Sequence, residues 1–407
     1  MTATATPTPE NTHSRRRPPL LLLIAIAIAA GIGAGYCFPV WLARVFVTVN
    51  SLFSQFLGFI IPLLILGLVA PAIVEIGNRA GKMLVFTVLL AYGATILAGL
   101  FSYFTGSTFF PSLIPVDRYI EAETNSVDLS PYFTIEMTPL MSVTSALVLA
   151  FTLGLCVARF APHQSALCEV LTDFRTVIIM VIRSVIVPLL PLYIFGIFLT
   201  MTLSGEVGGM LVTFIKVIGI IFVMHVVLLV AQYLIGAAID RKNPFKCLAT
   251  MMPAYFTALG TASSAATIPV TLRQAKVMGI DPAVADFTVP LCATIHMSGS
   301  TMKITACALA LMIAHSMPYD FPMFAGFIAM LGITIVAAPG VPGGAIMASL
   351  GLLSSMLGFS EADNALMIAL YVAMDSFGTA CNVTGDGALA LIVDRFFGGR
   401  TAPTESR

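Results

Sequence analysis

The stretch Met374–Asp386, MDSFGTACNVTGD, stands inside an apolar run and carries polar side chains at helical spacing. Its four polar positions lie at i, i+4, i+7 and i+11, which places them on one face of a helix; they are Asp375, Thr379, Asn382 and Asp386. An ionised side chain at the centre of a membrane helix costs about 2.5–3.5 kcal/mol on insertion scales. The polar face therefore turns into a helix bundle, where it forms either a solute and ion site or only a structural link between helices.

The composition indicates an all-α integral membrane protein. Of 407 residues, 58% are apolar and 10% are charged, whereas roughly a quarter of the residues of a soluble domain are charged. A formal net charge of zero and the lack of a basic stripe exclude nucleic acid as a partner and leave the lipid bilayer. The cysteines lack CxxC spacing and indicate small core residues rather than metal or redox chemistry; they are Cys37, Cys156, Cys168, Cys247, Cys292, Cys307 and Cys381.

Apolar runs long enough for membrane helices fill the first part of the chain. Such a helix needs about 20 residues, and the runs that offer them cover residues 20–38, 45–74, 83–105, 139–160, 176–203 and 207–239. Two later runs, 244–275 and 320–358, are interrupted by the small-residue stretches TASSAAT (261–267) and PGVPGG (339–344). Each of these two runs predicts a pair of half-helices that meet at a turn.

Two further apolar spans, 284–316 and 362–394, contain the polar runs HMSGST (296–301) and NVTGDG (382–387), where we expect the helices to break. Non-helical backbone at membrane depth is tolerated only where it is buried in protein or lines a cavity. Paired interrupted segments and inverted repeats are typical of secondary transporters, whose binding sites lie at such breaks. The pattern therefore predicts a solute carrier.

The distribution of charge predicts the orientation, because Lys and Arg gather in cytoplasmic loops. Most of the basic residues fall on one side if the N-terminus is cytoplasmic, and the loop 106–138 is acidic apart from Arg118, as expected outside. We expect a disordered cytoplasmic tail at residues 1–18 and a cytoplasmic tail at residues 399–407. The chain is then a multi-pass protein of a bacterial or archaeal plasma membrane (the cell inner membrane in a bacterium), with both termini in the cytoplasm.

A second polar face is expected near the middle of the span 284–316, where His296, Ser300 and Lys303 stand at i, i+4 and i+7. The imidazole either donates to a carbonyl or exchanges protons, which histidine does near neutral pH. A buried ammonium must pair with a carboxylate or lose its proton, so Lys303 needs a partner such as Asp375 or Asp386.

The sequence contains few features that are typical of an enzyme or an ion channel. It has no HExxH, Walker loop, CxxC pair or Ser-His-Asp order, and His296 near Ser300 is a poor nucleophile and base pair. An ion channel usually shows pore-lining repeats or a carbonyl filter, and neither is visible. We therefore expect a transporter that is no enzyme and needs no cofactor, with the ion channel as the competing class.

The interrupted stretches together resemble the dicarboxylate/amino-acid:cation symporter family, the glutamate-transporter homologues that include archaeal aspartate transporters. The stretches that carry the resemblance are TASSAATIPVTLRQAK (261–276), ATIHMSGST (293–301), PGVPGG (339–344) and MDSFGTACNVTGD (374–386). The resemblance implies eight transmembrane helices, two re-entrant hairpins, a homotrimer and an elevator mechanism.

Within that fold, the resemblance implies two domains. The first, second, fourth and fifth spans form a scaffold and trimerisation domain over residues 19–82 and 139–205. Residues 83–105 and 207–398 form the transport domain, which contains both hairpins and the two broken spans.

The resemblance also implies a substrate site. The residues that match it are Ser263 and Ser264 at the first hairpin tip, Val341 and Gly343 at the second, and Ser300, Asp375, Gly378, Thr379 and Asn382 on the broken spans. Asp375 matches the residue that holds the substrate's amino group. Gly378 stands where acidic-substrate members carry an Arg, the residue suited to bidentate carboxylate binding, so we expect a small, neutral amino acid. The alternative is an acidic amino acid or dicarboxylate held by Lys303.

The coupling-ion residues depart from the family pattern. The family's NMDG reads His296-Met297-Ser298-Gly299 here, and Val88 and Ala91 stand where oxygen ligands are expected. Asn382 and Asp386 remain as a weak sodium site, and Lys303 or His296 brings a cationic group instead. We therefore expect reduced or absent sodium coupling, with protons at His296 or Asp386 driving transport, or with exchange in place of symport.

Overall fold

The computed structural model describes residues 20–77, 82–114, 129–160, 165–205, 207–336 and 343–399, and all regular structure in these ranges is helical. The helices of the first half are α1 (Leu20–Cys37), α2 (Val40–Gly77), α3 (Lys82–Leu113), α5 (Val143–Phe160), α6 (Ala166–Val181), a π-helical turn η1 (Ile182–Ile186), α7 (Val187–Leu203) and α8 (Val207–Asp240). Those of the second half are α9 (Pro244–Thr261), α10 (Ser264–Val277), α11 (Pro282–Ile295), α12 (Ser298–Ala314), α13 (Phe321–Val336), α14 (Gly344–Leu357), α15 (Glu361–Ala373) and α16 (Asp375–Phe397).

The long apolar helices confirm the prediction of an all-helical membrane protein. Within the described ranges, five helices are long and apolar enough to cross a bilayer, and up to six if the bent pair α15–α16 is one span. The five cover Val40–Pro71, Lys82–Leu113, Ala166–Leu203, Val207–Asp240 and Pro282–Ala314. At two other predicted spans, 20–38 and 139–160, the apolar helices Leu22–Cys37 and Val148–Phe160 are shorter.

Some predicted boundaries are wrong. Helix α3 continues to Leu113, well past the expected end at residue 105, and the fifth helical segment begins at Ala166 rather than at 176. Both extensions add polar or charged residues that a hydropathy pattern leaves out but that helix termini tolerate. The π-helical turn η1 lies just before Pro188, which has no N–H to bond to the carbonyl one turn earlier, so the hydrogen-bond register shifts there.

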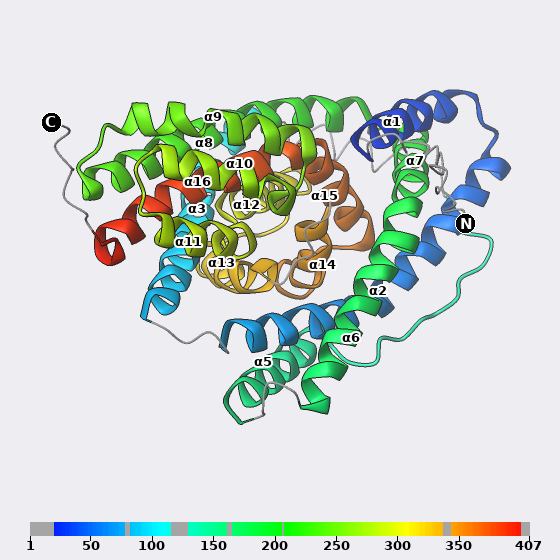
Figure 1. The fold of residues 1–407 in the computed structure, drawn as a ribbon. Helices are drawn as coiled ribbons and strands as arrows, with labels where there is room; N and C mark the ends of the chain where they lie inside the picture. The colour runs from blue at the N-terminus through cyan, green and yellow to red at the C-terminus, as the bar shows by residue number, and fades with distance from the viewer. Residues whose placement is uncertain are drawn as a thin grey trace, which may run out of the picture.

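The helices pack in two groups (Figure 1). In one group, α2 packs against α5, α6 and α7, and α1 packs against α7. In the other, α12 lies at the centre, in contact with α3, α8, α13, α15 and α16, while α9, α10 and α11 cover α16. Every residue of α12 is buried, which explains why a helix this rich in Ser, Thr and Ala needs no outward apolar face.

The first interrupted run forms the predicted pair of half-helices. Helices α9 and α10 pack together and join at Ala262 and Ser263. Ala262 takes the left-handed conformation, with φ +49°, and the Ser263 hydroxyl accepts a hydrogen bond from the backbone N–H of Ala266. The small residues of this stretch therefore make a tight turn and cap the second half-helix.

The second interrupted run forms α13 and α14, which pack against each other. Residues 337–342 lie outside the described ranges, and Val341 lies with them. The description resumes at Gly343, whose φ of +78° suits glycine and which precedes the first residue of α14. The predicted tails at 1–18 and 399–407 also fall outside the described residues, apart from Gly399.

One of the two expected helix breaks occurs where the sequence predicts it. Helices α11 and α12 are separated at His296 and Met297, in the HMSGST stretch. The break expected at NVTGDG is wrong, because α16 runs without interruption from Asp375 to Phe397. The chain bends by 61° at Met374 instead, so that the Asp375 carboxylate lies at the positive N-terminal end of α16, where it is favoured.

Candidate substrate and coupling-ion site

The side chain of Asn382 joins α16 to the start of α12. Its Oδ1 accepts hydrogen bonds from the backbone N–H groups of Gly299 (2.8 Å) and Ser300 (3.4 Å). The first N–H groups of a helix have no partner within the helix, so the amide caps α12 from outside. Its Nδ2 donates to the Ser300 hydroxyl at 3.0 Å and to the Met297 sulfur at 3.5 Å. The two broken spans are therefore held together where their polar stretches meet.

Asp375 connects this centre to the second hairpin. Its Oδ2 accepts a hydrogen bond from the backbone N–H of Gly343 at 2.7 Å. Its side chain lies 10% exposed, and the Thr379 hydroxyl donates to its backbone carbonyl at 3.1 Å. The carboxylate of Asp375 thus contacts Gly343, the residue before α14. Asp375 is also the first residue of α16, the helix that carries Asn382.

Lys303 is fully buried in α12 and points its ammonium at the bend between α15 and α16. Its Nζ donates to the Met374 carbonyl at 3.2 Å, lies 3.5 Å from Asp375 Oδ1, and stands 3.5 Å from the centroid of the Tyr371 ring. The sequence left either Asp375 or Asp386 as the partner of Lys303, and the structure pairs it with Asp375. The π face of Tyr371 adds a cation–π contact.

Gly378 leaves space that the Lys303 ammonium takes up. A Cβ placed on Gly378 would lie 2.8 Å from Lys303 Nζ and 3.8 Å from the Ser300 hydroxyl. The hydroxyl of Ser300 also accepts from the phenol of Tyr371 at 3.3 Å. A side chain at position 378 would therefore face a cation from the neighbouring helix.

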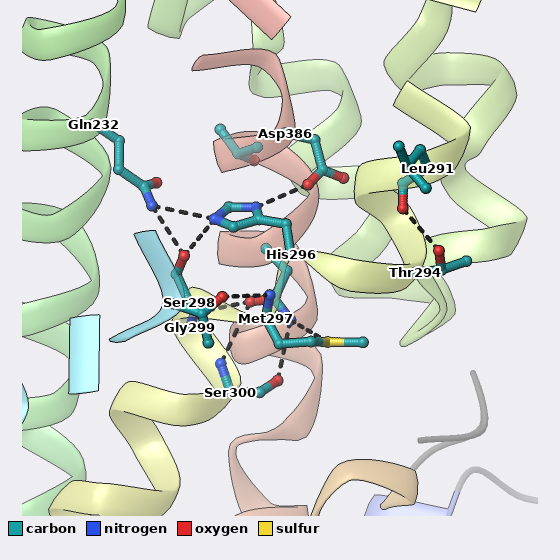
Figure 2. A network of polar contacts seen from close by, with 12 residues as sticks. Gln232, Leu291, Thr294, His296, Met297, Ser298, Gly299, Ser300 and Asp386 are labelled. Atoms are coloured by element: carbon teal, nitrogen blue, oxygen red, sulfur yellow. Dashed lines mark hydrogen bonds and ion pairs between the residues drawn. The ribbon is translucent and has the colours of Figure 1, made fainter. Parts of the chain in front are cut away.

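A second polar cluster surrounds His296, as Figure 2 shows. Its Nδ1 lies 2.9 Å from Asp386 Oδ1, and both side chains are buried. On the other edge of the ring, Nε2 contacts the Ser298 hydroxyl. The amide of Gln232, from α8, lies 3.1 Å from that hydroxyl and 3.4 Å from His296 Nε2. The second carboxylate oxygen of Asp386 is buried and has no hydrogen-bond partner among the residues that the structure describes.

The expectation that His296, Ser300 and Lys303 share one helical face is wrong. His296 ends α11 with non-helical backbone angles (φ −92°, ψ 106°), so helical spacing does not carry through to α12. The histidine turns to Asp386, whereas Lys303 turns to Asp375. The break therefore separates His296 and Lys303 into two clusters, each with its own carboxylate.

The first hairpin tip stands apart from these hydrogen bonds. Ser263 and Ser264 are half-exposed, and the hydrogen bonds described for Ser263 stay within its own hairpin. Among the described residues, no group of three or more His, Cys, Asp and Glu side chains could hold a metal ion. A cation bound near Asp375 or Asp386 would need hydroxyl, amide or carbonyl oxygens beside the single carboxylate.

Three residues of the site were not predicted from the sequence. Gln232 contacts the His296 cluster, Tyr371 contacts Lys303 and Ser300, and the Thr95 hydroxyl accepts from the backbone N–H of Met297 at 3.2 Å. Each is an isolated polar residue in an apolar helix. Such a residue needs a buried partner, and that need is the signal by which Gln232 in particular could have been found.

Comparison with known proteins identifies the family. The chain matches the sodium:dicarboxylate symporter family over residues 20–396. It is 28% identical over 367 residues to a serine/threonine transporter of Acinetobacter baumannii, which covers 85% of this chain and 89% of that protein. It is 34% identical over 161 residues to human excitatory amino acid transporter 2, which covers 39% of this chain and 28% of that protein. The chain belongs to the sodium:dicarboxylate symporter family and is a multi-pass, cation-coupled secondary transporter rather than an enzyme.

Proposed function

We propose that the protein carries a small neutral amino acid, such as serine, threonine or alanine, and that protons rather than sodium ions drive it. The similarity to a serine/threonine transporter extends over 89% of that relative and supports the substrate class. The contacts of Gly378, Lys303 and His296 support it independently.

The site has few groups left to bind a second substrate carboxylate. Asp375 provides an anion for the substrate's amino group, and Ser300 with Asn382 offers a hydroxyl and an amide. A side-chain carboxylate would need a cation in bidentate geometry, but position 378 is Gly and the Lys303 ammonium is already paired with Asp375. A small neutral side chain requires none of these.

The second candidate is an acidic amino acid or dicarboxylate. The observation that favours it is the position of Lys303 Nζ, which a Cβ on Gly378 would approach to 2.8 Å. A lysine that left Asp375 could bind a substrate carboxylate there as a point charge. We rank it second because that move would leave Asp375 without a cation when the substrate lacks an amino group.

Coupling to sodium would require oxygen atoms that are free to bind the ion. Hard cations are held by oxygen ligands. The Oδ1 atom of Asn382 already accepts two backbone N–H groups, and Oδ1 of Asp386 faces the His296 imidazole. A histidine paired with a carboxylate can instead carry the proton that drives transport. A proton bound at this pair would balance the charge of the buried Asp386 without any metal ion.

The architecture that we propose follows the family resemblance. It has eight transmembrane helices, two re-entrant hairpins (α9–α10 and α13–α14) and inverted repeats, and it assembles as a homotrimer in the plasma membrane with both termini in the cytoplasm. The packing of α1, α2, α5, α6 and α7 with one another supports a scaffold, and the packing of α3 and α8–α16 around α12 and α16 supports a transport domain. The second group would move as a unit in an elevator mechanism.

Uptake by proteoliposomes tests this function. Purified protein is reconstituted, and labelled serine and aspartate are supplied under an imposed proton gradient, an imposed sodium gradient, or neither. We expect serine to accumulate with the proton gradient alone and aspartate to compete weakly. Accumulation that depends fully on sodium would overturn the coupling, and a preference for aspartate or a dicarboxylate would favour the second candidate.

A further inference from the structure

We propose that the Lys303 ammonium is a built-in substitute for the substrate's amino group. It neutralises Asp375 when no substrate is bound, so Gly343 at the start of α14 stays bound to that carboxylate while the empty carrier returns across the membrane. This inference rests on the proposed function, because it requires a substrate that carries an amino group. It adds a role for Lys303 that does not involve a substrate carboxylate.

Asp375 has two partners, one at each carboxylate oxygen. Oδ2 holds the backbone N–H of Gly343 at 2.7 Å, and Oδ1 faces Lys303 Nζ at 3.5 Å. The start of α14 is therefore bound to a carboxylate whose charge is balanced from α12. A buried charge that loses its counter-charge is strongly destabilising, so burying Asp375 against Gly343 without a cation would be unfavourable.

The contact between the ammonium and the carboxylate is longer than the hydrogen bonds that the two groups make to the backbone. At 3.5 Å, it is longer than the 3.2 Å bond from Lys303 Nζ to the Met374 carbonyl and longer than the 2.7 Å bond from Gly343 to Asp375. A pair held at this distance can be replaced by a second ammonium without breaking the other bonds. The substrate's amino group would take Oδ1, while Gly343 keeps Oδ2.

The surroundings of Lys303 can hold the displaced ammonium. The Met374 carbonyl and the Tyr371 ring, at 3.2 Å and 3.5 Å, are neutral partners that do not depend on Asp375. Gly378 has no side chain to obstruct a small shift, since even a Cβ there would come within 2.8 Å of Nζ. Lys303 therefore has partners in both the empty and the substrate-bound carrier. Asp375 exchanges the lysine ammonium for the substrate's amino group.

This role predicts a change in affinity of the opposite sign from that of a carboxylate clamp. If Lys303 competes with the substrate for Asp375, its removal tightens substrate binding and impairs the return of the empty carrier. If Lys303 binds a substrate carboxylate, its removal weakens binding. The sign of the change in Kd therefore separates the two roles.

The experiment uses full-length protein in proteoliposomes with labelled serine as the probe. For Lys303→Met, we expect the ratio of net uptake to serine–serine exchange to fall by about tenfold or more, because exchange does not need an empty return, and the Kd for serine to fall several-fold. The matched control is Lys216→Met, whose ammonium donates to the Leu113 carbonyl at 2.7 Å on the exposed side of α8; it should keep the wild-type ratio.

An unchanged ratio, an equal loss of both activities in folded protein, or a raised Kd would overturn the inference. If Lys303→Met does not fold, Lys303→Arg decides: its cation should preserve net uptake, and exchange without net uptake would count against the proposal. Absence of serine exchange by the wild-type protein would instead refute the proposed function itself. The two failures are therefore distinguishable in one set of assays.

Discussion

The imidazole of His296 lies 2.9 Å from the carboxylate of Asp386, although the two residues are 90 positions apart in the chain. The contact joins the end of α11 to the middle of α16, and both groups are buried. In such a dry environment, charge interactions are stronger than in water and an unpaired charge is costly. The proton that one such pair holds therefore determines the net charge buried at this contact.

Replacing the histidine should separate proton coupling from substrate binding. We expect His296→Asn to reduce proton-driven accumulation of serine by about tenfold or more, within the range of typical coupling free energies, because Asn cannot take up the proton. The measurement is uptake by proteoliposomes with and without an imposed pH gradient. His315→Asn serves as the control, since His315 pairs with Asp363 at 2.7 Å beyond the other end of α12. Undiminished gradient-driven uptake by His296→Asn would contradict proton coupling at this pair.

The amide of Asn382 should matter for stability as well as for transport. Asn382→Ala removes the acceptor of the Gly299 N–H, and we expect a loss of about 1–3 kcal/mol in the free energy of unfolding, as for a buried donor left without a partner. Thermal unfolding in detergent measures it. Asn364→Ala is the matched control, because the half-buried Asn364 donates to the hydroxyl of the exposed Ser354 and caps no helix from outside. Equal effects of the two substitutions would argue against the capping role of Asn382.

The polar face of α16 was predictable from the sequence, whereas its partners were not. Helical spacing alone places Asp375, Thr379, Asn382 and Asp386 on one side, and all four are buried. The contact of Gln232 with the His296 cluster depends on how α8 packs, which no periodicity specifies. The bend at Met374 was missed for a similar reason, because the polar residues of NVTGDG bond to other helices and do not interrupt their own.

Substrate selectivity should follow the charge at position 378. We expect Gly378→Arg alone to bind both serine and aspartate poorly, because the new side chain meets the Lys303 ammonium, 2.8 Å from the position of a Cβ. Gly378→Arg combined with Lys303→Met removes that repulsion and should raise the affinity for aspartate by about tenfold or more, as a bidentate charged pair allows. Competition of unlabelled aspartate with labelled serine measures the change. Gly378→Ala with Lys303→Met fills the same space without charge and should show no such gain; an equal gain would exclude the guanidinium as its cause.

The close packing of α8 against α16 should affect both the stability of the protein and proton-driven uptake. A Cβ on Gly236 would lie 2.6 Å from the Ala388 carbonyl, whereas a Cβ on Gly219 of the same helix has no atom within 4 Å. Gly236→Ala should therefore lower the free energy of unfolding by about 1–3 kcal/mol through overpacking, and Gly219→Ala should raise it by up to about 1 kcal/mol through helix propensity. Because α8 carries Gln232 and α16 carries Asp386, a forced separation should also weaken the contacts around His296 and reduce proton-driven uptake by Gly236→Ala alone. Thermal unfolding and uptake measured on both variants test the two effects, and a stable Gly236→Ala protein with normal coupling would show that the two helices tolerate a wider spacing.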